Sequence, residues 1–195
     1  MITSVGMQNY GPIADFRWGN LGRVNLVIGP NKSGKTYLFK AMYSAIRMVE
    51  ANRRVRELRK DTELLFDKLY WTFQVEAIGR LVRTGGKALD FEMTLDGSQA
   101  LAYTFGPAAV RQPNILHNSC LPRQCNSIFL PAKEILSLQG VIIRSRETEQ
   151  EFGFDNTYYD LARALTPTKK GKNYKEFSQM REKLEQSIGG HIEYD

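Results

Sequence analysis

The feature that most constrains this chain is a glycine-rich stretch near its N-terminus, Gly29-Pro30-Asn31-Lys32-Ser33-Gly34-Lys35-Thr36. Its glycines, lysine and threonine have the spacing G-x-x-x-x-G-K-[ST] of a phosphate-binding loop. Such a loop must curl so that successive backbone N–H groups converge on one anion, and residues without a β-carbon tolerate that backbone and that close approach. The spacing therefore predicts a nucleoside triphosphate site.

Two side chains of the loop are suited to the charges of a nucleotide. Lys35 is expected to neutralise the β- and γ-phosphate oxygens, and the Thr36 hydroxyl is a hard oxygen ligand suited to Mg²⁺. The predicted cofactors are therefore ATP or ADP with Mg²⁺, and Thr36 is the predicted metal ligand. The predicted nucleotide-binding residues are Gly29, Asn31, Lys32, Ser33, Gly34, Lys35, Thr36 and Tyr37.

The segments on both sides of the loop fit this interpretation. Residues 24–28 form an apolar run short enough for a buried parallel strand that ends at the first glycine. After Thr36, apolar residues recur at helical spacing, so a helix is predicted to begin inside the loop and to point its positive N-terminal end at the phosphates. These residues are Leu38, Met42, Ala45, Ile46 and Val49. The alternative is an ordinary glycine turn between a strand and a helix.

Composition excludes several other classes of protein. The 195 residues suffice for one domain, with or without a small insertion, and 42% of them are hydrophobic. No apolar run approaches the ~18 residues of a membrane span, and residues 1–11 do not resemble a secretion signal, so we expect a cytoplasmic protein with no membrane partner. Cys120 and Cys125 are too few for a disulfide framework and are predicted to be free thiols.

Charge gives a weaker indication. The net charge of +6 permits contact with nucleic acid but is only a weak argument for it. Residues 50–68 read as a highly charged helix in which basic and acidic side chains interleave. A solvated face with local ion pairs explains that pattern better than a nucleic-acid stripe, which stays open as a minor alternative.

Hydrophobic patterning predicts an α/β domain with an antiparallel insertion. Residues 2–17 read as one or two strands that precede the loop. Residues 70–78 are strand-like, and Asp96-Gly97 between two alternating runs is a strong hairpin signal. We therefore predict one ATP-binding domain over residues 1–195, in which residues 70–105 form an antiparallel β subdomain.

A second candidate for the site follows an apolar run late in the chain. Residues 106–127 show no period and are predicted to be an irregular loop, and residues 128–130 then form a short apolar strand. Because ligands of open α/β sheets bind beyond the carboxyl ends of the strands, Lys133 and Glu134 are candidates to face the phosphates or the metal-bound water. Glu134 is the candidate catalytic residue, and an exposed loop pair is the alternative.

The sequence resembles the ABC-type ATPase heads of the SMC and RecF group and the OLD-like ATPases. The specific match runs from Asn9-Tyr10 through Phe16 to the glycine-rich loop. Residues 129–134 and 154–161 are more weakly similar to segments of bacterial AAA ATPases of that group, which extends the resemblance to most of the chain. The resemblance implies a P-loop NTPase fold in which this chain is the N-terminal lobe of a head.

Heads of this family carry a serine-rich signature motif and, in a C-terminal lobe, a Walker B strand that ends in Asp-Glu. The sequence has neither, since residues 128–130 end at Pro131 and residues 141–143 end at Arg144. The resemblance thus implies that hydrolysis requires a missing C-terminal lobe or a second subunit. It also implies a dimer that closes ATP between one loop and the partner's signature motif. The chain alone is expected to have little or no ATPase activity.

Two other functions stay open. A small nucleotide kinase would suit the length and the loop, but the hairpin stands where its phosphoacceptor site and arginine-rich lid should follow. A regulatory module that holds nucleotide without turning it over is the stronger competitor. Phosphoryl transfer to a nucleoside would indicate the kinase, and binding without turnover would indicate the module.

Overall fold

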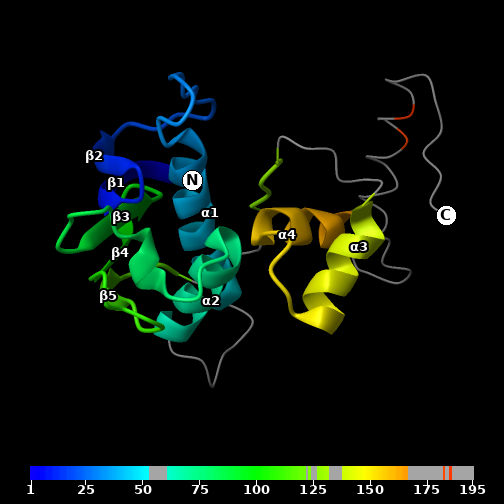
Figure 1. Cartoon of the computed structure of the whole chain (residues 1–195). Coiled ribbons are helices and arrows are strands. Elements are labelled where there is room, and N and C mark those ends of the chain that lie inside the picture. The colour runs from blue at the N-terminus through cyan, green and yellow to red at the C-terminus, as the bar shows by residue number, and fades with distance from the viewer. Residues whose placement is uncertain are drawn as a thin grey trace. The chain divides into compact units, whose positions relative to one another are not determined.

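The structure is a computed structural model that describes residues 1–52, 61–121, 123, 127–131, 138–166, 182 and 185. These residues form an α/β arrangement of helices and a five-stranded antiparallel sheet (Figure 1). The chain divides into two units, Met1–Ala162 and Arg163–Asp195. The sheet and the glycine-rich loop both belong to the first unit.

The sheet joins strands from both sides of the loop in the order β2-β1-β3-β4-β5. Because side chains alternate between the two faces of a strand, the buried residues of β3 all point to one face of the sheet. They are Leu89, Phe91, Met93 and Leu95. The strands are β1 (Ile2–Tyr10), β2 (Ile13–Trp18), β3 (Leu89–Leu95), β4 (Gln99–Phe105) and β5 (Asn114–Asn118).

The hairpin predicted at Asp96-Gly97 is confirmed. β3 and β4 pair in register up to Leu95↔Gln99. Asp96 and Gly97 have φ angles of 50° and 78°, the left-handed conformation that tight hairpin connections require. The one or two strands predicted over residues 2–17 are present as two, the antiparallel pair β1 and β2.

Two helices cover the buried face of the sheet (Figure 1). α1 (Lys35–Asn52) follows the glycine-rich loop, and α2 (Asp61–Phe73) packs against it. Their fully buried side chains belong to the same hydrophobic core as the inner residues of the sheet. Ala41, Ala45 and Met48 of α1 and Leu65 and Leu69 of α2 are members of this group.

Shorter elements complete the described structure. They are a 3₁₀ turn η1 (Ile78–Leu81), a short helix α3 (Gln139–Arg144), a π-helical turn η3 (Ser145–Glu149) and a helix α4 (Asn156–Leu165). α4 ends at Leu165, two residues before Pro167 in the sequence. Among the described helices, none combines the length and apolar character needed to cross a bilayer.

Two sequence-based expectations for these elements are wrong. Residues 70–78, predicted as strand-like, continue α2 as far as Phe73, because the buried Leu65, Leu69 and Thr72 extend one helical stripe. Residues 106–127, predicted as irregular, contain the edge strand β5. β5 buries no residue fully, so its sequence lacks the alternation that marks a half-buried strand.

Leu69→Ala should destabilise the protein by about 2–5 kcal/mol, because Leu69 is fully buried between α2 and the core and its truncation leaves a cavity. Leu116→Ala on β5 is the control, since that side chain is 59% exposed and should change the free energy of unfolding by less than about 0.5 kcal/mol. Urea unfolding followed by circular dichroism measures both. Equal effects of the two substitutions would contradict this placement of α2.

Candidate nucleotide site

Helix α1 begins at Lys35, inside the glycine-rich loop, as predicted. The Leu38 amide donates to the Gly34 carbonyl at 2.9 Å. The first amides of a helix have no acceptor within it, and no carbonyl of the described ranges accepts from those of Lys35, Thr36 and Tyr37. With the positive end of the helix dipole, these amides form a position suited to an anion.

The backbone of the loop turns sharply just before the helix. Gly34 has a φ of 93°, a conformation that residues with a side chain rarely adopt, so the second fixed glycine of the motif is required by the backbone itself. Lys32 also has a positive φ, of 66°. Asn31, Lys32 and Ser33 are exposed. A ligand can therefore reach the loop from solvent.

The Lys35 side chain turns back into the loop. Its ammonium group donates to the carbonyl oxygens of Gly29 at 2.6 Å and Pro30 at 2.7 Å, and lies 3.5 Å from the Ser33 hydroxyl. One positive charge thus joins the two ends of the loop. A bound phosphate would offer the Lys35 ammonium charged oxygen acceptors in place of these neutral carbonyls. Hydrogen bonds between two charged groups are stronger than those to a neutral carbonyl.

The surroundings of the loop favour a negative ligand and leave the predicted metal ligand accessible. Thr36 is exposed, so its hydroxyl is open to a hydrated cation. The sequence contains no Asp or Glu between Asp15 and Glu50, whereas six Lys and Arg residues lie in that interval. No group of three His, Cys, Asp or Glu side chains within the described ranges is arranged to hold a metal ion.

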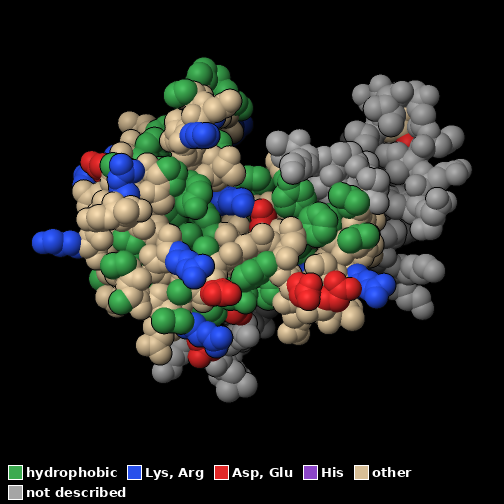
Figure 2. Space-filling model, in the orientation of Figure 1, with side chains coloured by type: hydrophobic (Ala, Val, Ile, Leu, Met, Phe, Trp, Pro, Cys, Tyr) green, Lys and Arg blue, Asp and Glu red, His purple; other side chains and the backbone are tan. Residues whose placement is uncertain are grey.

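The buried parallel strand predicted before the loop is not present. Residues 24–28 belong to no strand, and Val24, Leu26 and Ile28 are 90%, 78% and 84% exposed, while Val27 packs against the core. A buried parallel strand needs neighbours on both sides, and the nearby β1 is already flanked by β2 and β3. Figure 2 shows hydrophobic side chains gathered on this loop at the top of the view.

An ionic network fixes the polar side of α1 to the start of α4. The Lys40 ammonium lies 2.6 Å from Asp155 Oδ2. Asp160 Oδ2 accepts from the Tyr43 hydroxyl at 2.7 Å and from Arg47 Nε at 3.1 Å. Lys40, Tyr43 and Arg47 follow the i, i+3, i+7 spacing of one helix face, so α1 presents donors where α4 presents carboxylates.

Asp155 has a second role at the start of α4. Its Oδ1 accepts from the amide of Thr157 at 2.8 Å and from the hydroxyl of the same residue at 2.6 Å. It is therefore the N-cap of α4 and the partner of Lys40 at the same time. Both carboxylate oxygens thus accept hydrogen bonds from within the chain.

Residues 127–131 are tied to α1 by another buried carboxylate. Glu50 is 3% exposed, and its Oε1 accepts from the Ser127 amide at 3.1 Å and the Ser127 hydroxyl at 2.7 Å. Phe129 packs edge-on against Tyr43, with ring centroids 5.7 Å apart. Ile128 and Leu130 point the other way and are 61% and 75% exposed.

The candidate catalytic residue lies outside the described residues. Glu134 and its neighbour Lys133 follow residues 127–131 in the sequence, and their placement relative to the loop stays a prediction. Cys125 also lies outside the described part, whereas Cys120 is a free thiol as predicted. Burial raises the pKa of Cys120, which makes it less reactive than an ordinary cysteine.

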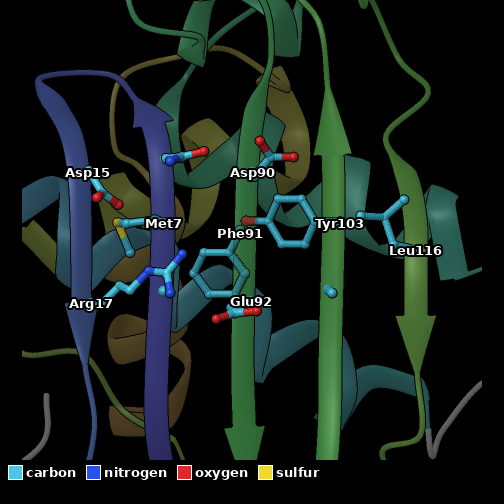
Figure 3. A pocket seen from close by; sticks show the side chains of 11 residues that line it. Met7, Asp15, Arg17, Asp90, Phe91, Glu92, Tyr103 and Leu116 are labelled. Carbon is cyan, nitrogen blue, oxygen red and sulfur yellow. The ribbon is translucent and has the colours of Figure 1, made fainter.

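A second concave site, of about 140 Å³, lies on the opposite face of the sheet from the helices (Figure 3). Asp15 and Arg17 of β2 and Asp90 and Glu92 of β3 surround it. Gly6 leaves room for Glu92, since a β-carbon at Gly6 would lie 2.8 Å from Glu92 Oε1. The sequence analysis did not predict this site. The signal that could have indicated it is the spacing of two between the charged residues of each strand, which places them on one face of the sheet.

No protein-family model matches this chain, and a search of curated proteins finds no significant match. The resemblance to ABC-type heads therefore stays a prediction that rests on the residues of the glycine-rich loop and its flanks. The geometry of the loop, the start of α1 and the network behind it are the observations on which a function can be argued.

Asp160→Ala should lower the free energy of unfolding by about 3 kcal/mol, because it leaves Arg47 and Tyr43 without the carboxylate they share in a mostly buried site. Asp15→Ala is the matched control: it removes an exposed carboxylate from the sheet and should cost less than about 0.5 kcal/mol. Urea unfolding compares them. A small effect of Asp160→Ala would show that the network contributes little to stability.

Proposed function

We propose that this chain binds ATP or ADP with Mg²⁺ through residues 29–36, as part of an ABC-type P-loop ATPase. One observation carries the proposal: α1 starts at Lys35 with its first amides and the lysine ammonium directed to the same curled loop. Backbone amides, helix dipole and ammonium together provide the three sources of positive potential that phosphate recognition uses. Thr36 supplies the hydroxyl ligand for Mg²⁺.

The proposal includes a second polypeptide segment that completes the site. Large apolar side chains are exposed at residues 24–28, which precede the glycine-rich loop, and at residues 127–131, which contact α1. Between Phe39, Met42 and Ile46 of α1 and residues 127–130 lies a hollow of about 400 Å³. Apolar surface of this kind marks a contact site. A lobe or subunit that carries a Walker B Asp-Glu and a signature motif would cover it and add the missing acids.

The binding step is tested by titration calorimetry with Mg·ATP and Mg·ADP. Lys35→Ala should weaken binding by about 10- to 100-fold, because it removes a charge-assisted hydrogen bond to phosphate. Lys87→Ala is the matched control, since it removes an exposed lysine elsewhere on the chain and should leave the affinity unchanged. If wild type and Lys35→Ala bind equally well, the loop is not the nucleotide site.

The described chain should bind nucleotide without steady hydrolysis. The sequence provides no Walker B pair, and both oxygens of Asp155, the acid held against α1 by Lys40, are already engaged. Release of phosphate from Mg·ATP should therefore stay at background. Steady turnover that Lys35→Ala abolishes would mean that the chain already holds a complete catalytic site, with Glu134 as the first residue to examine. Phosphate transfer to an added nucleoside would favour the kinase instead.

The exposed apolar segment should make the isolated chain associate. Light scattering and binding of a dye that fluoresces on apolar surface should both report this, and the triple variant Val24→Ser, Leu26→Ser, Ile28→Ser should reduce both signals. The matched control is Leu116→Ser, which removes one exposed apolar side chain from β5. A monomeric wild type that binds no dye would show that no further polypeptide is needed to cover this surface.

A further inference from the structure

The turn between β1 and β2 reaches the glycine-rich loop from the side of the sheet. It consists of Gly11 and Pro12, between the paired residues Tyr10 and Ile13. Its position is fixed by three hydrogen bonds to the chain around η1. The Gly11 amide donates to the Leu81 carbonyl at 2.7 Å, Arg83 Nη1 donates to the Pro12 carbonyl at 2.7 Å, and the Arg83 amide donates to the Asn9 carbonyl at 2.8 Å.

The turn touches the loop and the first helical turn at two separate places. A β-carbon on Gly34 would lie 2.9 Å from Ile13 Cγ1 and 3.3 Å from Pro12 Cγ. A β-carbon on Gly11, whose φ is 53°, would lie 2.4 Å from Tyr37 Cε1. Both distances are too short for real atoms, so the two glycines let the turn and the loop approach more closely than any other residue would.

The other side of Tyr37 is closed as well. Its ring lies 5.2 Å, centroid to centroid, from the ring of Phe73 in α2. The first turn of α1 is therefore held between the β1–β2 turn and α2. One end of the loop is thus packed against a part of the sheet that is itself held by hydrogen bonds.

We propose that Gly11, Pro12 and Ile13 are positioning residues for the nucleotide site: they hold Gly34 and the first turn of α1 where the amides and Lys35 can converge on a phosphate. The proposal rests on the proposed nucleotide binding. It assigns no contact between the turn and the nucleotide. A displacement of the turn should reach the phosphates through Gly34 and Tyr37 only.

The test is the affinity for Mg·ADP, measured by calorimetry beside the free energy of unfolding. Gly11→Ala inserts a β-carbon into the Tyr37 ring and should weaken binding about tenfold. Gly97→Ala is a matched control: Gly97 also has a positive φ, of 78°, but a β-carbon there would have no neighbour within 4 Å. It should destabilise the fold through the same backbone strain and leave the affinity unchanged.

Two further variants keep the test decisive if Gly11→Ala does not fold. Ile13→Ala removes the contact with Gly34 without straining the turn and should weaken binding several-fold, whereas Ile13→Val keeps both γ-carbons and should bind like wild type. In a double-mutant cycle, Gly11→Ala should cost less affinity in a Tyr37→Leu background than in wild type, because the obstructing ring is gone.

The outcomes separate this inference from the proposed function. If wild type does not bind Mg·ADP, the proposed function fails and the inference fails with it. If wild type binds and Lys35→Ala binds about 10- to 100-fold more weakly, but Gly11→Ala and Ile13→Ala bind as wild type does, the loop is the site and the positioning role is overturned. Loss of affinity in Gly97→Ala equal to that in Gly11→Ala would also overturn it, since general destabilisation would then explain both.

Discussion

The enclosure of α1 is the constraint on which the rest of the structure depends. Residues 40–51 include no exposed side chain, so this helix is buried on nearly every side. Such a helix cannot shift along its axis without breaking contacts with the sheet, with α2 and with α4. Because the glycine-rich loop runs directly into its first turn, the position of the loop is fixed by packing many residues away. The loop is thus attached to a helix that packing holds in place.

Burying α1 requires that its polar groups be paired, since an unpaired charge in the interior costs several kcal/mol. Lys40 and Arg47 meet Asp155 and Asp160, Glu50 meets Ser127, and the Ser44 hydroxyl donates to the Lys40 carbonyl at 2.8 Å. The pairs with residues outside α1 lie at different points along the helix, so a shift of the helix along its axis would break them together. Burial also affects Lys68 of α2. It lowers the pKa of the Lys68 ammonium, because the charged form loses its hydration, and the negative charge of the nearby Asp160 opposes this effect.

The elements that depend on local pattern could be predicted from the sequence, and those that depend on partners could not. The start of α1 follows from Gly34-Lys35-Thr36, and the β3–β4 hairpin from Asp96-Gly97. Residues 24–28 have the composition of a buried strand, yet composition cannot show whether neighbouring strands are available. Nor could spacing reveal that Asp155 and Asp160, more than a hundred residues away, pair with α1, or that Gly11 and Tyr37 touch.

The two segments with exposed apolar side chains differ in how they present them. In residues 127–131, Ser127 and Phe129 face α1 while Ile128 and Leu130 face solvent, a period of two that belongs to strands. Residues 24–28 do not alternate in this way: Val27 packs against the core, but the adjacent Val24 and Asn25 are both exposed, as are Leu26 and Ile28. Only residues 127–131 therefore have the alternation of a strand, without a partner strand to pair with in the described sheet. Neither segment belongs to a strand of the described sheet, and both leave large apolar side chains on the surface. Residues 24–28 run directly into the glycine-rich loop at Gly29. A polypeptide that covers their exposed apolar side chains would therefore also lie next to the loop.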